Sequence, residues 1–252
     1  MMQYPPIFKL NLLLALWCCF TTANGQITPS TDEENLVDKL WEAIGGESNW
    51  QNARYFMFTC AGGNKSFAIG QRKYLWDKQT GDCRFDGITT DDERITVLFN
   101  IETGEGSVYL ANTALENPRT TQDIITEVTA EFKRDAQLLF LPTIMEAGSA
   151  AYQITGEKLI GSQRYTVIQV DNEHTPFETS VNGELYVNSQ TGQIHQWRPD
   201  DGSTGFAVSD YKAIGSGLTL PTNFDANDSA ASITYPIAAA LTYIEGDKFK
   251  KP

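Results

Sequence analysis

Histidine is scarce in this chain, which has two in 252 residues, His174 and His195. A zinc site takes about three or four protein ligands, so both histidines would have to converge with a carboxylate. His174 lies in a turn-like sequence and His195 in a predicted strand, and their spacing does not force them together. The carboxylates that would serve are Glu173, Glu178 and Asp200. We predict ordinary turn or surface histidines and no bound metal.

Motifs of nucleophilic catalysis and nucleotide binding are also missing. The chain has no GxSxG elbow, and the nearest pieces, 148–150 and 215–217, lack its spacing and are typical of turns. It has no GxGxxG sequence and no P-loop. A reactive thiol needs a neighbouring histidine or a helix N-terminus, whereas Cys60 and Cys83 lie in predicted strands. The sequence therefore predicts no catalytic residue and no cofactor.

Basic residues are few, 19 against 32 acidic ones, and the formal net charge is −13. This balance argues against binding nucleic acid, and against long-range attraction to an anionic membrane surface. Two acidic runs, 91–93 and 200–201, fall in turn-like segments, where aspartate commonly stabilises the local backbone. A weak Ca²⁺ site is the alternative, although neither run has the alternating ligands of a calcium-binding loop.

Long apolar runs are missing except at the N-terminus. There, Lys9 precedes the apolar run Leu10–Phe20, which is too short to span a bilayer. Residues 23–25 read Ala-Asn-Gly and place small residues at the −3 and −1 positions of a cleavage site. The pattern predicts a signal peptide over residues 1–25 and an exported protein, periplasmic or extracellular, that starts at Gln26.

Two alternatives to cleavage at this site stay open. One is a retained membrane anchor, and the other is lipid attachment at Cys18 or Cys19. A lipobox has a small residue before its cysteine, whereas Trp17 or Cys18 stands there. We therefore expect a chain without a transmembrane segment after cleavage. Residues 26–252 are predicted to form one domain, present as a monomer.

Alternating apolar residues separated by turn sequences predict a large antiparallel sheet. The stretch Asn64–Gly87 is predicted to be a hairpin with its turn at 78–81, flanked by the strands Ala53–Cys60 and Glu93–Ile101 in one meander. Pro221 and Pro236 predict edge positions or bulges in the last strands. The other predicted strands are Ser107–Ala111, Tyr152–Ile160, Arg164–Asp171, Val181–Asn188, Ile194–Arg198, Phe206–Ile214, Leu218–Phe224 and Ser232–Tyr243.

The strand order also bears on the two cysteines of the mature chain. Cys60 ends the strand before the hairpin and Cys83 begins the strand after its turn, so the strand Ser66–Trp76 separates them. At about 3.3 Å per residue this separation is roughly 25–30 Å. A disulfide requires Cα atoms within about 7 Å of each other. We predict two unpaired, buried thiols.

Two segments have helical periodicity. Ser30 and Glu33 form a capping pair before an apolar stripe that ends at Gly45-Gly46. A second helix is predicted over Gln122–Leu141, ended by Pro142. The sequence thus predicts an α+β fold, a strongly curved antiparallel sheet or incomplete β-barrel, whose concave face is covered by helices.

Aromatic residues concentrate on the predicted meander. One interpretation is that they pack fully against the helices. The other is that packing is incomplete and leaves an apolar hollow between the sheet and the second helix, because half-barrel mouths are common ligand sites. The residues expected to line that hollow are Phe56, Phe58, Tyr74, Trp76, Phe85, Phe99, Ile124, Val128 and Phe132.

Three segments resemble a family of exported bacterial proteins of unknown activity. They are 72–87 (RKYLWDKQTGDCRFDG), 132–148 (FKRDAQLLFLPTIMEAG) and 174–201 (HTPFETSVNGELYVNSQTGQIHQWRPDD). The order of elements is similar to that of the periplasmic lipoprotein-carrier superfamily of LolA and LolB. The resemblance implies an incomplete β-barrel closed by helices, and true carriers of that superfamily accept acyl chains in the barrel. No catalytic residue comes with it.

We therefore expect a non-enzymatic, carrier-like protein that binds an apolar or lipidated ligand. The first alternative is an exported enzyme acting on a small or envelope-derived substrate through the acidic loops and His174. The second is a structural protein of the cell envelope. Polar groups that converge in the hollow would favour the enzyme, because catalysis needs at least two titratable groups within reach of one substrate atom.

Overall fold

The computed structural model describes residues 31–63, 68–146, 151–172, 181–227 and 232–252, and the side chains of 31–34 and 172 are not described. In these residues thirteen strands form one antiparallel sheet with the order β6-β5-β4-β3-β2-β1-β13-β12-β11-β10-β9-β8-β7. The strands are β1 Tyr55–Gly62, β2 Arg72–Asp77, β3 Asp82–Ile88, β4 Arg94–Asn100, β5 Gly106–Leu110, β6 Thr113–Ala114, β7 Ala151–Ile160, β8 Gln163–Asn172, β9 Val181–Asn188, β10 Ile194–Pro199, β11 Phe206–Gly215, β12 Leu218–Ala226 and β13 Ile233–Leu241.

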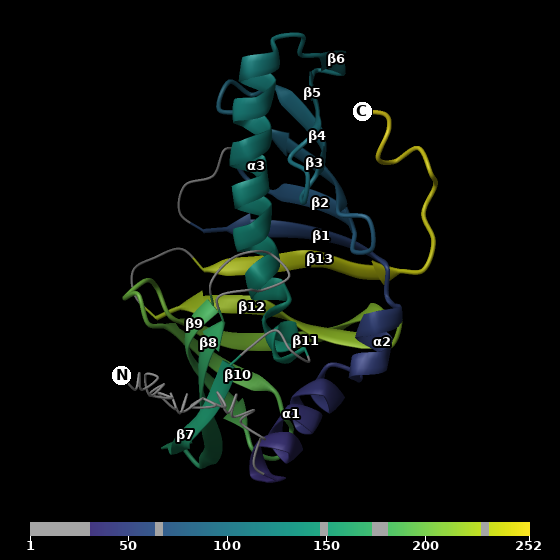
Figure 1. Cartoon of the computed structure of the whole chain (residues 1–252). Helices are drawn as coiled ribbons and strands as arrows, with labels where there is room; N and C mark the ends of the chain where they lie inside the picture. Colours follow the sequence, from purple (N-terminus) through teal and green to yellow (C-terminus); the bar gives the residue numbers. More distant parts are fainter. Residues whose placement is uncertain (1–30, 64–67, 147–150, 173–180, 228–231) are drawn as a thin grey trace, which may run out of the picture.

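The sheet consists of two meanders joined through the last strand. β1 to β6 follow one another, β7 to β13 follow one another, and β13 then pairs with β1. The sheet stays open, with β6 and β7 at its two edges, and it curls around α3 (Figure 1). The predicted α+β half-barrel is confirmed. No helix among the described residues is both long and apolar enough to cross a membrane.

The helices are α1 Thr31–Ala43, α2 Glu47–Asn52, α3 Pro118–Leu139 and the 3-10 helix η1 Leu141–Met145. α3 runs along the concave side of β1 to β5 and continues toward β12 (Figure 1). It begins four residues earlier than predicted because the Asn117 side chain accepts hydrogen bonds from the Arg119 and Thr120 amides, and Pro118 occupies the first turn. It ends at Leu139, and Pro142 lies inside η1. Ser30, the predicted cap of the first helix, lies outside the described residues.

The predicted start of the second strand is wrong, and the prediction for the two prolines is confirmed only for Pro236, which lies at a bulge and not at an edge. β2 begins at Arg72 and not at Ser66, so the central hairpin is shorter than expected. β12 and β13 are interior strands, so neither proline lies at an edge. The residues that pair between these strands are Asn223 with Thr234 and Phe224 with Ile233, and Pro221 lies beyond them. Pro236 falls where the register of β13 against β1 shifts, because a residue without an amide hydrogen fits a bulge.

Cys60 and Cys83, the two cysteines of the described residues, are free and buried, as predicted. Cys60 is paired across the strands with Arg72, at one end of β2, and Cys83 with Trp76, toward the other end. We expect thiol labelling of the unreduced chain 26–252 to count two thiols after denaturation and almost none before it, because burial shields both sulfur atoms. A count of zero in the denatured monomer would contradict this strand order.

Candidate functional site

Eight of the nine residues expected to line a hollow lie between the sheet and α3. Six of them point inward from consecutive strands: Phe56 and Phe58 from β1, Tyr74 and Trp76 from β2, Phe85 from β3 and Phe99 from β4. Val128 and Phe132 meet them from α3 and are fully buried. Ile124 is only half-buried, because the helix stripe that faces the sheet passes through Ile125.

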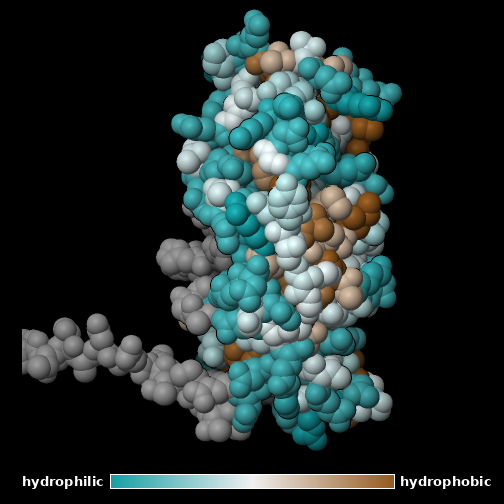
Figure 2. All heavy atoms as spheres, turned by 90° about the vertical axis from the view of Figure 1, so that its right-hand side faces the viewer, coloured by the Kyte–Doolittle hydropathy of each residue, from teal (hydrophilic) through white to brown (hydrophobic). Residues whose placement is uncertain are grey.

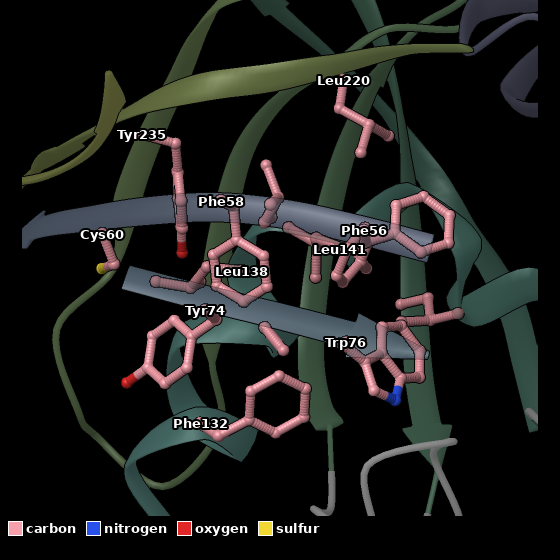
Figure 3. Close-up of a cluster of buried hydrophobic side chains, with 14 of the residues drawn as sticks. Phe56, Phe58, Cys60, Tyr74, Trp76, Phe132, Leu138, Leu141, Leu220 and Tyr235 are labelled. Atoms are coloured by element: carbon pink, nitrogen blue, oxygen red, sulfur yellow. The ribbon is translucent and has the colours of Figure 1, made fainter. Parts of the chain in front are cut away.

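These side chains pack against one another (Figure 3). The Phe132 ring lies 5.4 Å from Tyr74, 5.9 Å from Trp76 and 6.1 Å from Phe58, measured between ring centroids. Phe140, which follows α3, adds a second ring at 5.1 Å from Phe56. The space beneath α3 is therefore filled with aromatic rings in this conformation.

A buried ion pair lies at one border of this aromatic cluster and joins α3 to the sheet. The Arg72 guanidinium on β2 donates to both carboxylate oxygens of Asp135 on α3, from Nε at 2.6 Å and from Nη2 at 2.9 Å. The Tyr74 hydroxyl donates to the same carboxylate at 2.9 Å. Glu131, one helical turn earlier, places a carboxylate oxygen 3.7 Å from Arg72 Nε. All four side chains are buried.

The remaining contacts of the pair fix its geometry. Arg72 Nη2 lies 3.1 Å from the Cys60 sulfur atom, and Nη1 donates to the carbonyl oxygen of Gly62 at 3.2 Å. The Tyr235 hydroxyl of β13 donates to the main-chain carbonyl of Asp135 at 2.6 Å. Thus the turn of α3 that carries Asp135 is held by β2 and β13, and β1 holds the Arg72 side chain that pairs with it.

The electrostatics of this cluster favour the ordinary protonation states of Arg72, Cys60 and Tyr74. Burial, reinforced by the negative charge of Asp135, raises the pKa of the Cys60 thiol and of the Tyr74 hydroxyl. Burial opposes the charge on Arg72, but its hydrogen bond to Asp135 and the attraction between them raise the pKa of Arg72 overall. At neutral pH the cluster therefore holds a protonated guanidinium, a thiol and a phenol.

A cleft of about 640 Å³ opens directly beside this ion pair. Its walls come from the second half of α3, the end of β1, and the strands β9, β10, β11 and β13. Its lining is amphipathic: the apolar side chains are Leu138, Trp197, Phe206 and Ile233, and the charged ones are Arg72, Glu131, Arg134, Asp135, Asp200 and Asp201. Leu138 and Trp197 also belong to the main core, so the cleft borders the packed interior.

The other candidate residues do not gather into a site. The His195 ring stacks on Tyr165, 4.6 Å away, on the β8–β10 part of the sheet. Asp200 lines the cleft and accepts a hydrogen bond from Gln169 at 2.6 Å. The run 91–93 lies in the β3–β4 turn. His174, Glu173 and Glu178 lie outside the described residues. Within the part of the chain that is described, no three His, Cys, Asp or Glu side chains are grouped to hold a metal ion.

Some solved structures of other proteins are similar to this chain in the course of the backbone. No family model matches the chain, and no curated protein matches its sequence. Similar solved structures include a LolA superfamily protein from Nitrosomonas europaea, 12% identical over 85% of this chain and 96% of that one, with a TM-score of 0.45. A DUF1329 family protein from Desulfovibrio piger is 10% identical over 86% of this chain and 96% of that one, with a TM-score of 0.43. The lipoprotein LppX of Mycobacterium tuberculosis is 7% identical over 84% of this chain and all of that one, 100%, with a TM-score of 0.33.

The ion pair was not predicted from the sequence, although the positions of Arg72 and Asp135 in the apolar patterns indicate it. Arg72 shares the alternation of Tyr74 and Trp76, which places it on the inner face of β2. Asp135 lies three positions after Phe132, on the apolar stripe of α3. A charged residue on an apolar face is rarely buried without a partner of opposite charge. The two positions together point to one buried contact.

Proposed function

We propose that this protein is an exported, non-enzymatic carrier-like protein whose ligand has a long apolar part and a polar end. The observation that carries the proposal is the amphipathic cleft beside α3. Its volume lies within the roughly 300–1,000 Å³ range of ligand pockets. Apolar walls that continue into an aromatic core suit an acyl chain, and the exposed charges of Arg134, Asp200 and Asp201 suit a polar group that stays in water.

The chemistry of the described residues favours binding over catalysis. A general base or nucleophile must exchange a proton or attack near neutral pH, and the raised pKa values of Cys60 and Tyr74 keep both groups protonated there. Asp135 is occupied by three donors, two from Arg72 and one from Tyr74. Such a carboxylate holds α3 in place better than it accepts a substrate proton.

The packed aromatic cluster has a role in this proposal. The polar end of the ligand would stay among the charged residues of the cleft, and its apolar part would pass Leu138 and extend toward Phe132. The nine residues predicted from the sequence would then contact the apolar part. This contact requires α3 to move away from the sheet and Arg72 to separate from Asp135, because Phe132 lies between Glu131 and Asp135 on the helix. Export through cleavage of residues 1–25 would place the protein where envelope lipids and lipidated proteins occur.

The proposal is tested with a fluorescent fatty acid, cis-parinaric acid, added to the delipidated protein. Leu138 lines the cleft, so Leu138→Trp places a larger side chain in it. We expect saturable binding by the wild type and at least a tenfold weaker affinity of Leu138→Trp. Because Leu138 also belongs to the main core, this variant should melt at a lower temperature, and its affinity is measured where circular dichroism shows it folded.

Leu159→Trp is the matched control, because Leu159 is 69% exposed on β7 and outside the lining of the cleft. It should bind the probe as the wild type does. Absence of saturable binding by the wild type would contradict the carrier proposal. Equal affinity of both variants and the wild type would contradict the cleft as the site.

A further inference from the structure

The outer face of the β1–β4 part of the sheet combines exposed apolar residues with basic ones. Met57, Ile88 and Ile237 point outward from β1, β3 and β13, and Ile69 lies beside Ile88, to whose carbonyl its amide donates at 2.8 Å. These four side chains are 39–49% exposed. Figure 2 shows apolar side chains gathered along one flank of this side of the molecule, next to hydrophilic ones.

The C-terminal segment brings its lysines to the same face. Residues 242–252 run back along this side of the molecule (Figure 1). The Arg84 side chain on β3 fixes the segment by donating to the carbonyl oxygens of Lys248, at 3.3 Å, and Lys251, at 2.7 Å. Lys250 lies between them. A depression of about 830 Å³ joins Pro252 to Lys73, Arg84, Arg94, Ile69 and Ile88.

The result is a basic patch on an acidic protein. It contains six basic residues, Lys73, Arg84, Arg94, Lys248, Lys250 and Lys251. Three acidic residues accompany them: Asp86 pairs with Arg84, Glu245 with Lys248 and Asp247 with Lys251. The patch is therefore net positive, whereas the whole chain carries −13.

We propose that this patch, Lys73, Arg84, Arg94 and the lysines of 248–251 with Ile69 and Ile88, docks the protein on an anionic lipid bilayer. Peripheral membrane sites combine lysines, which attract anionic lipids, with exposed apolar side chains, which enter the headgroup region. The overall negative charge does not prevent docking, because salt screens charges beyond about 8–10 Å and the patch faces the bilayer directly. An acidic protein partner would match the charge but would leave the exposed isoleucines without a role.

The test compares two variants of equal net charge. In the first, Lys248, Lys250 and Lys251 are all replaced by Gln. In the second, the exposed residues Arg119, Lys158 and Lys212, which lie on α3, β7 and β11 outside the patch, are replaced by Gln. Sedimentation is measured with phosphatidylcholine vesicles, with and without about one-third phosphatidylglycerol.

We expect the wild type to bind the vesicles that contain phosphatidylglycerol and not those of phosphatidylcholine alone. Each lysine near an anionic surface contributes roughly a fivefold factor, so the first variant should bind on the order of 100-fold more weakly. The second variant should bind within about threefold of the wild type, because its charges lie on α3, β7 and β11, outside the patch. Ile88→Ser should lower the binding that persists at high salt.

Three results would overturn the proposal. The first is no binding of the wild type to anionic vesicles. The second is an equal loss in both charge variants, which would show that net charge and not the patch decides binding. The third is retention on immobilised polyglutamate without binding to vesicles, which would show that the face fits an acidic protein.

Discussion

Replacing Phe132 by alanine is expected to lower the free energy of unfolding by about 3–5 kcal/mol, as a Phe-to-Ala change does in a packed core. Phe132 is 0% exposed and its ring lies against those of Phe58, Tyr74 and Trp76. Because aromatic rings surround Phe132 on the sheet side, these rings cannot fill the cavity left by its side chain without losing their own contacts.

Urea denaturation measures this loss. Tyr243→Ala is the matched control, because Tyr243 is 78% exposed and its removal should change the free energy of unfolding by less than about 0.5 kcal/mol. A loss below about 1 kcal/mol for Phe132→Ala would contradict the packing beneath α3. It would instead support a hollow that is open in the free protein.

Replacing Arg72 by methionine is expected to cost a comparable amount, about 3–5 kcal/mol, because it leaves the buried Asp135 carboxylate without its cation. Both side chains are buried, with 5% of the Arg72 side chain and 7% of the Asp135 side chain exposed. The Tyr74 hydroxyl would still donate to Asp135, but one neutral hydrogen bond does not compensate a buried charge.

A double-mutant cycle measures the interaction energy between Arg72 and Asp135 separately from the effect of each substitution on other contacts. Asp135→Leu alone should also be strongly destabilising, because it leaves the buried Arg72 unpaired. The double variant Arg72→Met with Asp135→Leu should lose far less than the two single variants summed, since an apolar pair of similar volume replaces the ions. Strict additivity of the two losses would contradict a direct buried contact.

The inner face of the first meander could be predicted because the side-chain period of a strand is local. Alternation assigned Phe56, Phe58, Tyr74 and Trp76 to one face, and the structure buries all four. The same local rule gave the positions of Cys60 and Cys83 at opposite ends of β2, where each is paired across the strands. These features depend on neighbours in sequence.

The pairing of β13 with β1 could not be predicted, because no local pattern specifies which distant strands meet. The contact joins residues such as Phe58 and Ala238, which are far apart in the chain. The same is true of the C-terminal lysines, which reach Arg84 only because the chain turns back after β13. The chain is acidic in composition, and tertiary structure joins the lysine cluster of 248–251 to Lys73, Arg84 and Arg94 in one basic patch.

The start of α3 shows a second limit of prediction from the sequence. The apolar stripe marked the middle of the helix, but the first turn is exposed and carries no stripe, so periodicity placed the start four residues late. The signal was the dipeptide Asn117-Pro118, a capping side chain followed by a residue that favours the first helical turn.

Native mass spectrometry of the protein, purified without detergent from the cells that produce it, tests the carrier proposal most directly. The account predicts that part of the wild-type protein retains a bound molecule, whose mass after release is that of a lipid or a lipidated fragment. Leu138→Trp should retain much less of it, and Leu159→Trp as much as the wild type. A wild-type spectrum of bare protein alone, unchanged after incubation with vesicles of total envelope lipid, would contradict the account.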